Sequence, residues 1–264
     1  MLIRSESMNH YLKWMVDGHH FAFAGFSDAE WYCMMGLREG ERTGLGQIIS
    51  AEHGKLLFDV MKRRKNDERF LFAIPECIKE IPGLCNGDPD WFLGRNDIRI
   101  VGYERDRVTD DLAKAGKLYP FIRQLQDMNV VMIGPAPHRK CEFFLRYKHF
   151  VEIESPNLHL NPGGIERAVK EAIGYYQPAV YLVSAGVSAA VIIDRLYGKI
   201  EGSWFFDCGS MWDGFAKTGE QRQWRADLYR KPKDWRRWLI DCIEGKHSPD
   251  DGRHKWLRKQ YPEL

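Results

Sequence analysis

The chain has 264 residues, enough for one large domain or two small ones, and its 44% hydrophobic and 13% aromatic content supplies a buried core. The formal net charge of +2 gives the whole molecule no polyanion-binding character. No apolar run reaches the roughly 18 residues of a membrane span, and the N-terminus has no secretory signal pattern, so we expect a cytoplasmic protein. The six cysteines lie far apart without a Cys-x-x-Cys pair, which disfavours a zinc ribbon or a disulfide scaffold.

Short apolar runs alternate with amphipathic stretches along the chain. In chain order, we expect strands at 21–26, 70–74, 98–101, 129–134, 150–153, 179–184 and 203–207. Helices are expected at 5–16, 28–37, 51–64, 107–126, 139–147, 164–176 and 188–196. This alternation is typical of parallel βαβ units. The sequence therefore predicts an α/β domain over 1–216, with a Rossmann-like, mainly parallel sheet flanked by helices, and a helical extension over 217–264.

Ligands of such sheets bind beyond the carboxyl ends of the strands, so the residues after each strand are the candidates for chemistry. Asp28 and Glu30 follow the first strand and open a helix. Two carboxylates there suit Mg²⁺ or Mn²⁺, because these cations take oxygen ligands and keep substrate phosphates in their shell. The simpler interpretation is that Ser27 or Asp28 is a helix N-cap and that Glu30 favours the helix dipole.

The loop after the strand at 129–134 carries three basic residues in a row. His138, Arg139 and Lys140 fall in the first turn of the next expected helix, where backbone N–H groups and cations suit an anion. A solvated basic turn is an equally good interpretation.

Two later strand ends also present polar groups. Gly186 and Ser188 open a helix after the strand at 179–184, so their amides could approach a phosphate, although such a turn also serves helix packing. The last strand ends at Asp207, followed by Gly209, Ser210 and Asp213. A general base, a sugar-hydroxyl ligand or a turn-forming aspartate would all give this pattern.

Several enzyme classes lack their motifs in this chain. No His-x-x-x-His pair, Gly-x-Ser-x-Gly elbow or Gly-x-x-x-x-Gly-Lys loop occurs. Zinc proteases, hydrolases with a nucleophile elbow and P-loop kinases are therefore disfavoured.

The strand-end motifs, taken in order, resemble the GT-D glycosyltransferases, a family long catalogued as a domain of unknown function. That family's N-terminal signature is an arginine and an aromatic residue followed by Gly-Asp-Gly-Glu, which matches the stretch 25–30 and keeps Asp28 and Glu30. The closing half matches through the turn at 186–189, Asp194, and the strand end 207–210 with Asp213 beyond. The likeness spans about 8–215. The chain departs from the family at Gly25 for the arginine, at Ser27 and Ala29 for the two glycines, and in the 186–188 turn.

The resemblance implies transfer of a hexosyl or pentosyl group from a nucleotide-sugar donor. Asp28 and Glu30 would place the diphosphate through Mn²⁺ or Mg²⁺, or hold the sugar hydroxyls directly. The nucleotide-sugar donor, with its leaving phosphates, would be bound by Ser27, by His138, Arg139 and Lys140, by the amides near Gly186 and Ser188, and by the turn at Gly209 and Ser210. Asp207 or Asp213 would be the base that activates the acceptor.

The sequence leaves the acceptor open, and the residues after the family-like core suggest two possibilities. From Lys217 onward there are 13 lysine and arginine residues against 8 acidic ones, with Trp224, Trp235, Trp238 and Trp256 interleaved. This extension could dock DNA carrying a hydroxylated base, as in phage DNA glycosylation, or simply complete the core while the acceptor is a glycan. Two alternatives are a non-catalytic nucleotide-binding module and a nucleoside-processing enzyme on the same fold. The sequence leaves the oligomeric state open.

Overall fold

The computed structural model describes residues 3–4, 8–43, 46–74, 81, 89–96, 98–100, 103–105, 118–154, 156–175 and 178–216. The expected extension 217–264 lies outside them, as do residues 107–117 of one expected helix. Within the described residues, no helix is both long and apolar enough to cross a membrane.

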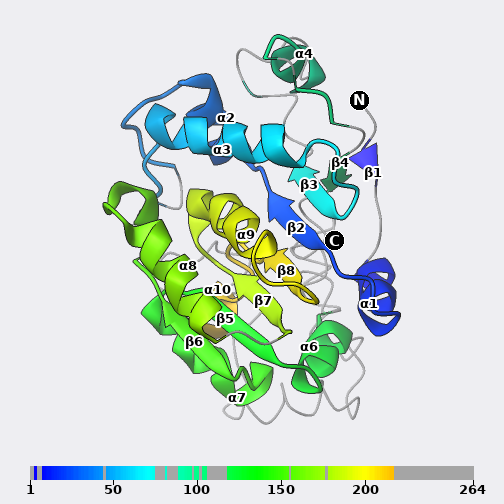
Figure 1. Ribbon diagram of the computed structural model, residues 1–264. Coiled ribbons are helices and arrows are strands. Elements are labelled where there is room, and N and C mark those ends of the chain that lie inside the picture. Colours follow the sequence, from blue (N-terminus) through cyan, green and yellow to red (C-terminus); the bar gives the residue numbers. More distant parts are fainter. Residues whose placement is uncertain are drawn as a thin grey trace, which may run out of the picture.

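The described strands form one sheet of eight, in the order β1-β4-β3-β2-β8-β7-β5-β6 (Figure 1). Every pairing between neighbouring strands is parallel, as expected for a Rossmann-like sheet. The strands are β1 (Ile3–Arg4), β2 (Ala22–Gly25), β3 (Phe70–Ile74), β4 (Tyr103–Arg105), β5 (Val130–Gly134), β6 (His149–Glu152), β7 (Val180–Val183) and β8 (Trp204–Asp207). The central strands β2 and β8 come from opposite ends of the described chain.

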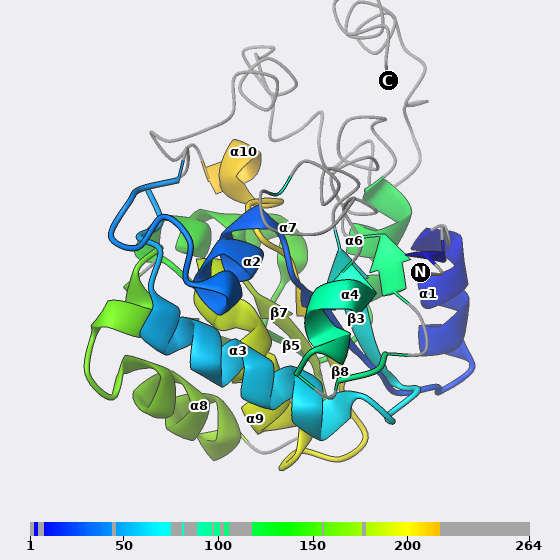
Figure 2. The ribbon, with the colours of Figure 1, turned by 90° about the horizontal axis from the view of Figure 1, so that it is seen from above.

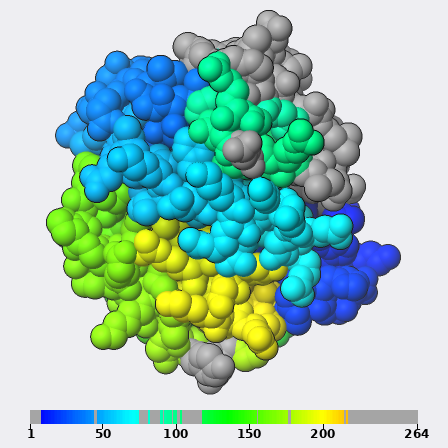
Figure 3. Space-filling view, turned by 45° about the horizontal axis from the view of Figure 1, so that its top comes forward, coloured from blue at the N-terminus to red at the C-terminus, as the bar shows by residue number. Residues whose placement is uncertain are grey.

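Helices cover both faces of the sheet, which gives three layers (Figure 2). One layer holds α2 (Asp28–Met35), α3 (Ala51–Arg64), α4 (Pro89–Gly94), α8 (Gly164–Gly174) and α9 (Ala189–Tyr197). The other holds α1 (Met8–Val16), α6 (Tyr119–Gln126), α7 (Glu142–Leu145) and α10 (Asp213–Ala216). Three 3₁₀ turns, η3 (Ala136–Cys141), η4 (Leu158–Leu160) and η5 (Gly186–Ser188), connect them. In the space-filling view, α3 forms a band across its face beside α8 and α9 (Figure 3).

Alternate side chains of each strand enter the two cores. In β2, Ala22 and Ala24 belong to the α3 side, whereas Phe23 belongs to the α6 side. In β8, Phe205 lies in the core on the α3 side and Phe206 lies in the core on the α6 side. Because successive strand residues point to opposite faces, strands covered on both sides are continuously apolar, which is the pattern that the sequence shows.

The expected elements differ from the structure in three places. The strand expected at 98–101 is wrong: residues 98–100 are not a strand, Ile98 is buried as part of a loop, and β4 begins at Tyr103. An apolar run this short serves a buried loop as well as a strand. The helix expected at 139–147 is instead η3 followed by the four-residue α7, which ends at Arg146 with φ 52°. Neither β1 nor α4 was predicted, because both are too short to show a period.

The cysteines behave as the sequence suggests where they are described. Cys33, Cys141 and Cys208 are buried and free of disulfides. The other three cysteines lie outside the described residues.

Candidate active site

The carboxyl ends of the two central strands bring their polar groups together. β2 and β8 run in parallel register, with Phe23 opposite Phe206. One carboxylate oxygen of Asp207, Oδ2, accepts a hydrogen bond from the Gly25 N–H at 3.2 Å, and Oδ1 accepts one from the Gly209 N–H at 2.9 Å. A Cβ on Gly25 would lie 2.7 Å from Asp207 Oδ2 and would displace the carboxylate. The backbone N–H groups of Gly25, at the end of β2, and of Gly209, in the turn after β8, therefore set the position of the Asp207 carboxylate.

Glu30 is the buried carboxyl group of this site, with 6% of its surface exposed. Burial, followed by the nearby carboxylates of Asp207 and Asp28, raises its pKa to about 8 against the opposing effect of backbone N–H groups. Its Oε2 has no hydrogen-bond partner in the described part of the chain. Near neutral pH the side chain therefore holds a proton and points an unsatisfied oxygen into a carboxylate-rich environment.

The helix-cap interpretation is also partly right. Ser27 is the N-cap of α2, although its side chain makes no capping hydrogen bond. The backbone N–H groups of Glu30 and Ser27 oppose the rise in the pKa of Glu30, as a carboxylate at the third helical position does when it reaches back to the N-cap. This role leaves Oε2 unsatisfied and leaves the Asp28 side chain exposed.

The donor set suits a hard cation only in part. Asp28, Glu30 and Asp207 offer oxygen ligands, which Mg²⁺ and Mn²⁺ prefer. Among the described residues, however, no group of three or more histidine, cysteine, aspartate or glutamate side chains has the geometry of a metal site. These residues fit a cation that is completed by ligand oxygens, not one held in an all-protein cage.

The turn after β7 lies one strand away from Asp207. Gly186 has φ 57°, and a Cβ there would come within 2.6 Å of Gln47 Nε2 and 3.1 Å of the Pro156 carbonyl oxygen. Ser188 is fully buried as the N-cap of α9, and its Oγ has no partner within the described residues. The Oγ of Ser184, the residue directly after β7, is also buried and has no hydrogen-bond partner within the described residues. This edge therefore holds buried polar groups that no residue in the described ranges satisfies.

A loop that sequence reasoning missed brings Gln47 to this turn. Asn157 accepts from the Ile48 N–H at 2.8 Å and donates to the Gly46 carbonyl at 3.1 Å. His159 Nε2 lies 2.9 Å from the Ile48 carbonyl. Residues 46–48 are thus tied to the segment after β6, more than 100 positions away, and the Gln47 carboxamide lies over Gly186. No sequence motif indicated this, because the contact depends on tertiary structure alone.

A buried histidine supports the same turn. The Nε2 atom of His53 lies 2.8 Å from the Val187 carbonyl oxygen. Burial lowers the pKa of His53 to about 4, so the ring is neutral near pH 7 and Nε2–H donates to that carbonyl. His53 therefore fixes the turn from the α3 side.

His138 and Asp213 form a pair that the sequence did not suggest. His138 is buried, and its Nε2 lies 2.9 Å from Asp213 Oδ1. Its Nδ1 has no partner among the described residues and would lie 2.9 Å from a Cβ on Gly134. The pair joins η3 to α10, so His138 binds a protein carboxylate and Asp213 is not an isolated base.

Arg139 points away from the central strands, and Lys140 is exposed. Arg139 Nε donates to Glu152 Oε2 at 2.9 Å, and its guanidinium lies 4.4 Å from the centre of the Phe150 ring. Both partners belong to β6, which lies three strands from β8, or about 14 Å at the usual spacing of about 4.8 Å between strands. The structure therefore does not bring Arg139 together with Asp28, Glu30 and Asp207.

The turn after β8 stays beside Asp207. Gly209 adopts φ 48°, which glycine accommodates without strain, and this conformation lets its N–H reach back to Asp207. The carbonyl of Ser210 accepts from the Asp213 N–H at 3.2 Å. Gly209 and Ser210 thus connect the Asp207 carboxylate to the His138–Asp213 pair.

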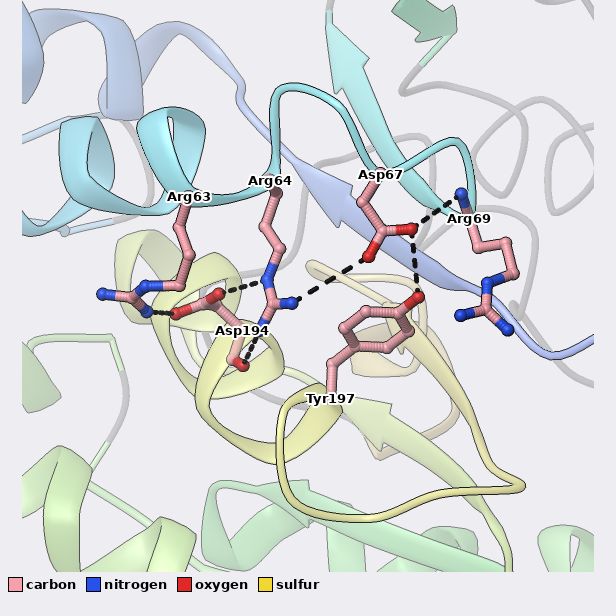
Figure 4. A network of polar contacts seen from close by, with 6 residues as sticks. All are labelled: Arg63, Arg64, Asp67, Arg69, Asp194 and Tyr197. Atoms are coloured by element: carbon pink, nitrogen blue, oxygen red, sulfur yellow. Dashed lines mark hydrogen bonds and ion pairs between the residues drawn. The ribbon is translucent and has the colours of Figure 1, made fainter.

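Asp194 lies in a separate, structural network (Figure 4). It is 2% exposed and is bound by Arg63 and by Arg64, whose Nε lies 2.7 Å from Asp194 Oδ1. The Arg64 guanidinium also lies over the Tyr197 ring at 4.9 Å. This network joins the ends of α3 and α9 that lead away from the carboxyl edge, so Asp194 does not join the candidate site.

Comparisons with known proteins place the fold. No family model matches the sequence, and no curated protein matches it. Among solved structures, a protein described as a new glycosyltransferase (DUF1792) from Streptococcus sanguinis is similar over 79% of this chain and 82% of its own, with 16% identity and a TM-score of 0.56. A domain of unknown function 1792, described as having a distinct glycosyltransferase fold, is similar over 79% of each chain, with 14% identity and a TM-score of 0.51. The fold that the sequence resemblance implied is thereby confirmed.

Proposed function

We propose that this chain, which shares the fold of those glycosyltransferase structures, transfers a sugar from a nucleotide-sugar donor to an acceptor hydroxyl. One observation carries the proposal. A buried glutamate with an oxygen that no described residue satisfies, Glu30, lies near enough to the carboxylates of Asp207 and Asp28 for both to raise its pKa, at the carboxyl ends of β2 and β8. Ligands of open parallel sheets bind at this edge.

Asp28 and Glu30 act on the donor. If a divalent cation, Mn²⁺ or Mg²⁺, takes part, Asp28 and Glu30 would hold it, because carboxylate oxygens are the hard ligands that these cations prefer. When bound, the cation neutralises the charge of the diphosphate leaving group. Without it, the protonated Glu30 donates a hydrogen bond to a sugar hydroxyl or phosphate oxygen.

The turn after β7 receives the diphosphate. Gly186 has no side chain, so the Gln47 carboxamide packs directly on its backbone, and Ser188 opens α9, whose N-terminal N–H groups favour an anion. The Gln47 carboxamide lies against Gly186 and donates to the same phosphate oxygens. Neutral donors thus replace the cations that the sequence suggested at Arg139 and Lys140.

Asp207 serves as the base for the acceptor. The assignment is supported by its closeness to Glu30, whose pKa its charge helps to raise, and by the two backbone N–H groups that orient its carboxylate. Asp213 is less suited to this task because it is paired with His138. A carboxylate held in this way accepts the proton of an attacking hydroxyl.

Two acceptor classes follow from the sequence. A glycan hydroxyl suits an enzyme of this fold, whereas a hydroxylated base in DNA suits the basic, tryptophan-rich residues 217–264. Transfer assays with both acceptor classes, before and after deletion of residues 217–264, decide between them.

A thermal-shift screen of nucleotide-sugars with and without Mn²⁺ tests the donor assignment. A ligand at 100 times its Kd stabilises the folded state by about 2.7 kcal/mol, which is readily detected. We expect one nucleotide class to raise the Tm, more so with Mn²⁺, and the same compound to be hydrolysed slowly without acceptor. If no nucleotide or nucleotide-sugar raises the Tm, the proposal is wrong.

A further inference from the structure

A shallow, open hollow of about 560 Å³ lies along the segment that joins β5 to β6. It includes the surface of α7, at the lower end of the molecule in Figure 1. Four of its lining side chains, Arg139, Lys140, Arg146 and Lys148, are cationic, and one, Glu142, is anionic. The hollow is separate from the carboxylate site, because Arg139 points to the edge strand β6.

Most of this positive charge is not neutralised by the protein. Lys140, Arg146 and Lys148 are exposed and form no salt bridge with other residues in the described ranges, whereas Arg139 pairs with Glu152. With Glu142 counted, the hollow keeps a surplus of two positive charges. Unpaired cations around one concavity raise the local potential and favour a ligand with several negative charges.

One wall of the hollow is held rigid before any ligand binds. The Arg139 guanidinium lies over the Phe150 ring at 4.4 Å and is held by Glu152 at 2.9 Å. Tyr147 Oη donates to the Arg139 carbonyl at 3.1 Å, and its ring lies 5.5 Å from that of Phe150. The half-buried Tyr147 ring is therefore fixed in place, which lowers the entropy cost of stacking a ligand on it.

The backbone conformation at Arg146 is a second feature of the hollow. Arg146 ends α7 in the left-handed region at φ 52°, where glycine or asparagine is usual. A residue with a Cβ there costs about 1 kcal/mol. The conformation turns the chain sharply, so that Arg146 and Lys148 both reach the hollow. At this cost, the position carries a cationic side chain that lines the hollow.

We propose that this hollow docks a single-stranded nucleic acid. Lys140, Arg146 and Lys148 contact successive backbone phosphates, and a base stacks on the Tyr147 ring. The cations surround an open depression and do not converge on one point. This arrangement suits an extended chain that passes through the hollow better than it suits a single phosphate group. Cations combined with an aromatic platform are the means by which proteins bind single strands without reading their sequence. The proposal does not depend on glycosyl transfer.

Fluorescence anisotropy of a labelled oligothymidylate with the full-length chain tests this docking site. The triple variant K140E/R146E/K148E should weaken binding at least about tenfold at low salt. The slope of log K against log salt should become shallower by about 0.7 for each phosphate that the variant no longer neutralises, or about 2 in all. Because all three side chains are exposed, the Tm of the variant should change little.

A matched control separates the hollow from net charge. K55E/K62E/K170E changes the charge by the same amount through exposed lysines on α3 and α8, in the opposite helical layer. It should keep the affinity within about threefold. At the stacking position, Tyr147→Leu should weaken binding, whereas Tyr147→Phe should preserve it.

Three results would overturn the proposal. The first is a wild-type chain that does not bind the oligothymidylate at low salt. The second is an equal fall in affinity in the two triple variants. The third is tighter binding of a duplex of the same length, which would exclude a single strand as the preferred ligand.

Discussion

Asp207 and Gly25 are joined across the two central strands: the Asp207 carboxylate accepts the Gly25 N–H at 3.2 Å, and any Cβ on Gly25 would displace it. The carboxylate that we propose as the base is therefore positioned by the bare backbone of the neighbouring strand. Glu30, whose pKa is raised first by burial and then by the carboxylate of Asp207, lies in the helix that follows β2.

Gly25→Ala tests this relationship. The added Cβ would lie 2.7 Å from Asp207 Oδ2, so the carboxylate must rotate. We expect kcat to fall at least about tenfold, with a loss of about 1 kcal/mol in the free energy of unfolding. Gly174→Ala is the matched control, because no atom lies within 4 Å of its Cβ position, and it should leave kcat unchanged. Equal activity of both variants would show that the Asp207 position does not matter.

Glu30→Gln tests the buried proton. The pKa of Glu30 rises on folding from its usual value of 4.5 to about 8, so between these values the folded state holds a proton that the unfolded state releases. The free energy of unfolding must therefore fall as pH rises through this window, by an amount on the order of a few kcal/mol. Above about pH 8 the loss is complete.

Urea unfolding of wild type and Glu30→Gln at several pH values measures this effect. The variant cannot ionise at position 30, so it should not share the loss of stability that the wild type shows between pH 5 and pH 8. The unfolding free energy of the variant should therefore rise relative to that of the wild type over this range. A difference that is constant with pH would show that Glu30 ionises normally in the folded protein.

Substitutions of Gln47 test its contact with the diphosphate. Gln47→Glu keeps the shape of the side chain but adds a negative charge beside Gly186, so it should weaken nucleoside diphosphate binding more than Gln47→Ala does. Calorimetric titration of each variant with the nucleotide that binds the wild type provides the comparison. A Gln47→Glu variant that binds as tightly as the wild type would place the phosphates elsewhere.

Asp194→Asn tests the structural network of Figure 4. Removing this buried charge takes the ion-pair partner from Arg63 and leaves Arg64 only its longer pair with Asp67 at 3.9 Å, so we expect a loss of about 3 kcal/mol in the free energy of unfolding. The exposed pair of Glu166 with Arg195 is the control, because Glu166→Gln should cost less than about 1 kcal/mol. Activity per folded molecule should persist in both variants. Its loss in Asp194→Asn alone would give Asp194 a role in the site.

Much of the fold could be predicted from the sequence. Strands covered on both faces, such as β5 and β7, are continuous apolar runs, and their periodic helical neighbours are long enough to recognise. The short elements β1, β4 and α4 could not be located, because a two- or three-residue strand or a six-residue helix shows no periodicity.

The site could be predicted only where it follows directly from strand ends. Asp28, Glu30 and Asp207 come together because parallel strands deliver their carboxyl ends to one edge. Side-chain direction was not accessible in the same way. His138, Arg139 and Lys140 are consecutive, yet His138 turns inward to Asp213, Arg139 binds Glu152 and Lys140 is exposed. The loop that carries Gln47 to Gly186 is held in place by contacts with residues 157 and 159, which lie far away in the sequence.

Release of nucleoside diphosphate from a nucleotide-sugar by wild type and Asp28→Ala tests the central claim most directly. Asp28 is exposed, so its removal should leave the Tm within about 2 °C while lowering turnover at least about 100-fold. A wild-type chain that releases nucleoside diphosphate from a donor, together with a folded but inactive variant, is the result that this account predicts. Equal turnover in the two proteins would contradict it.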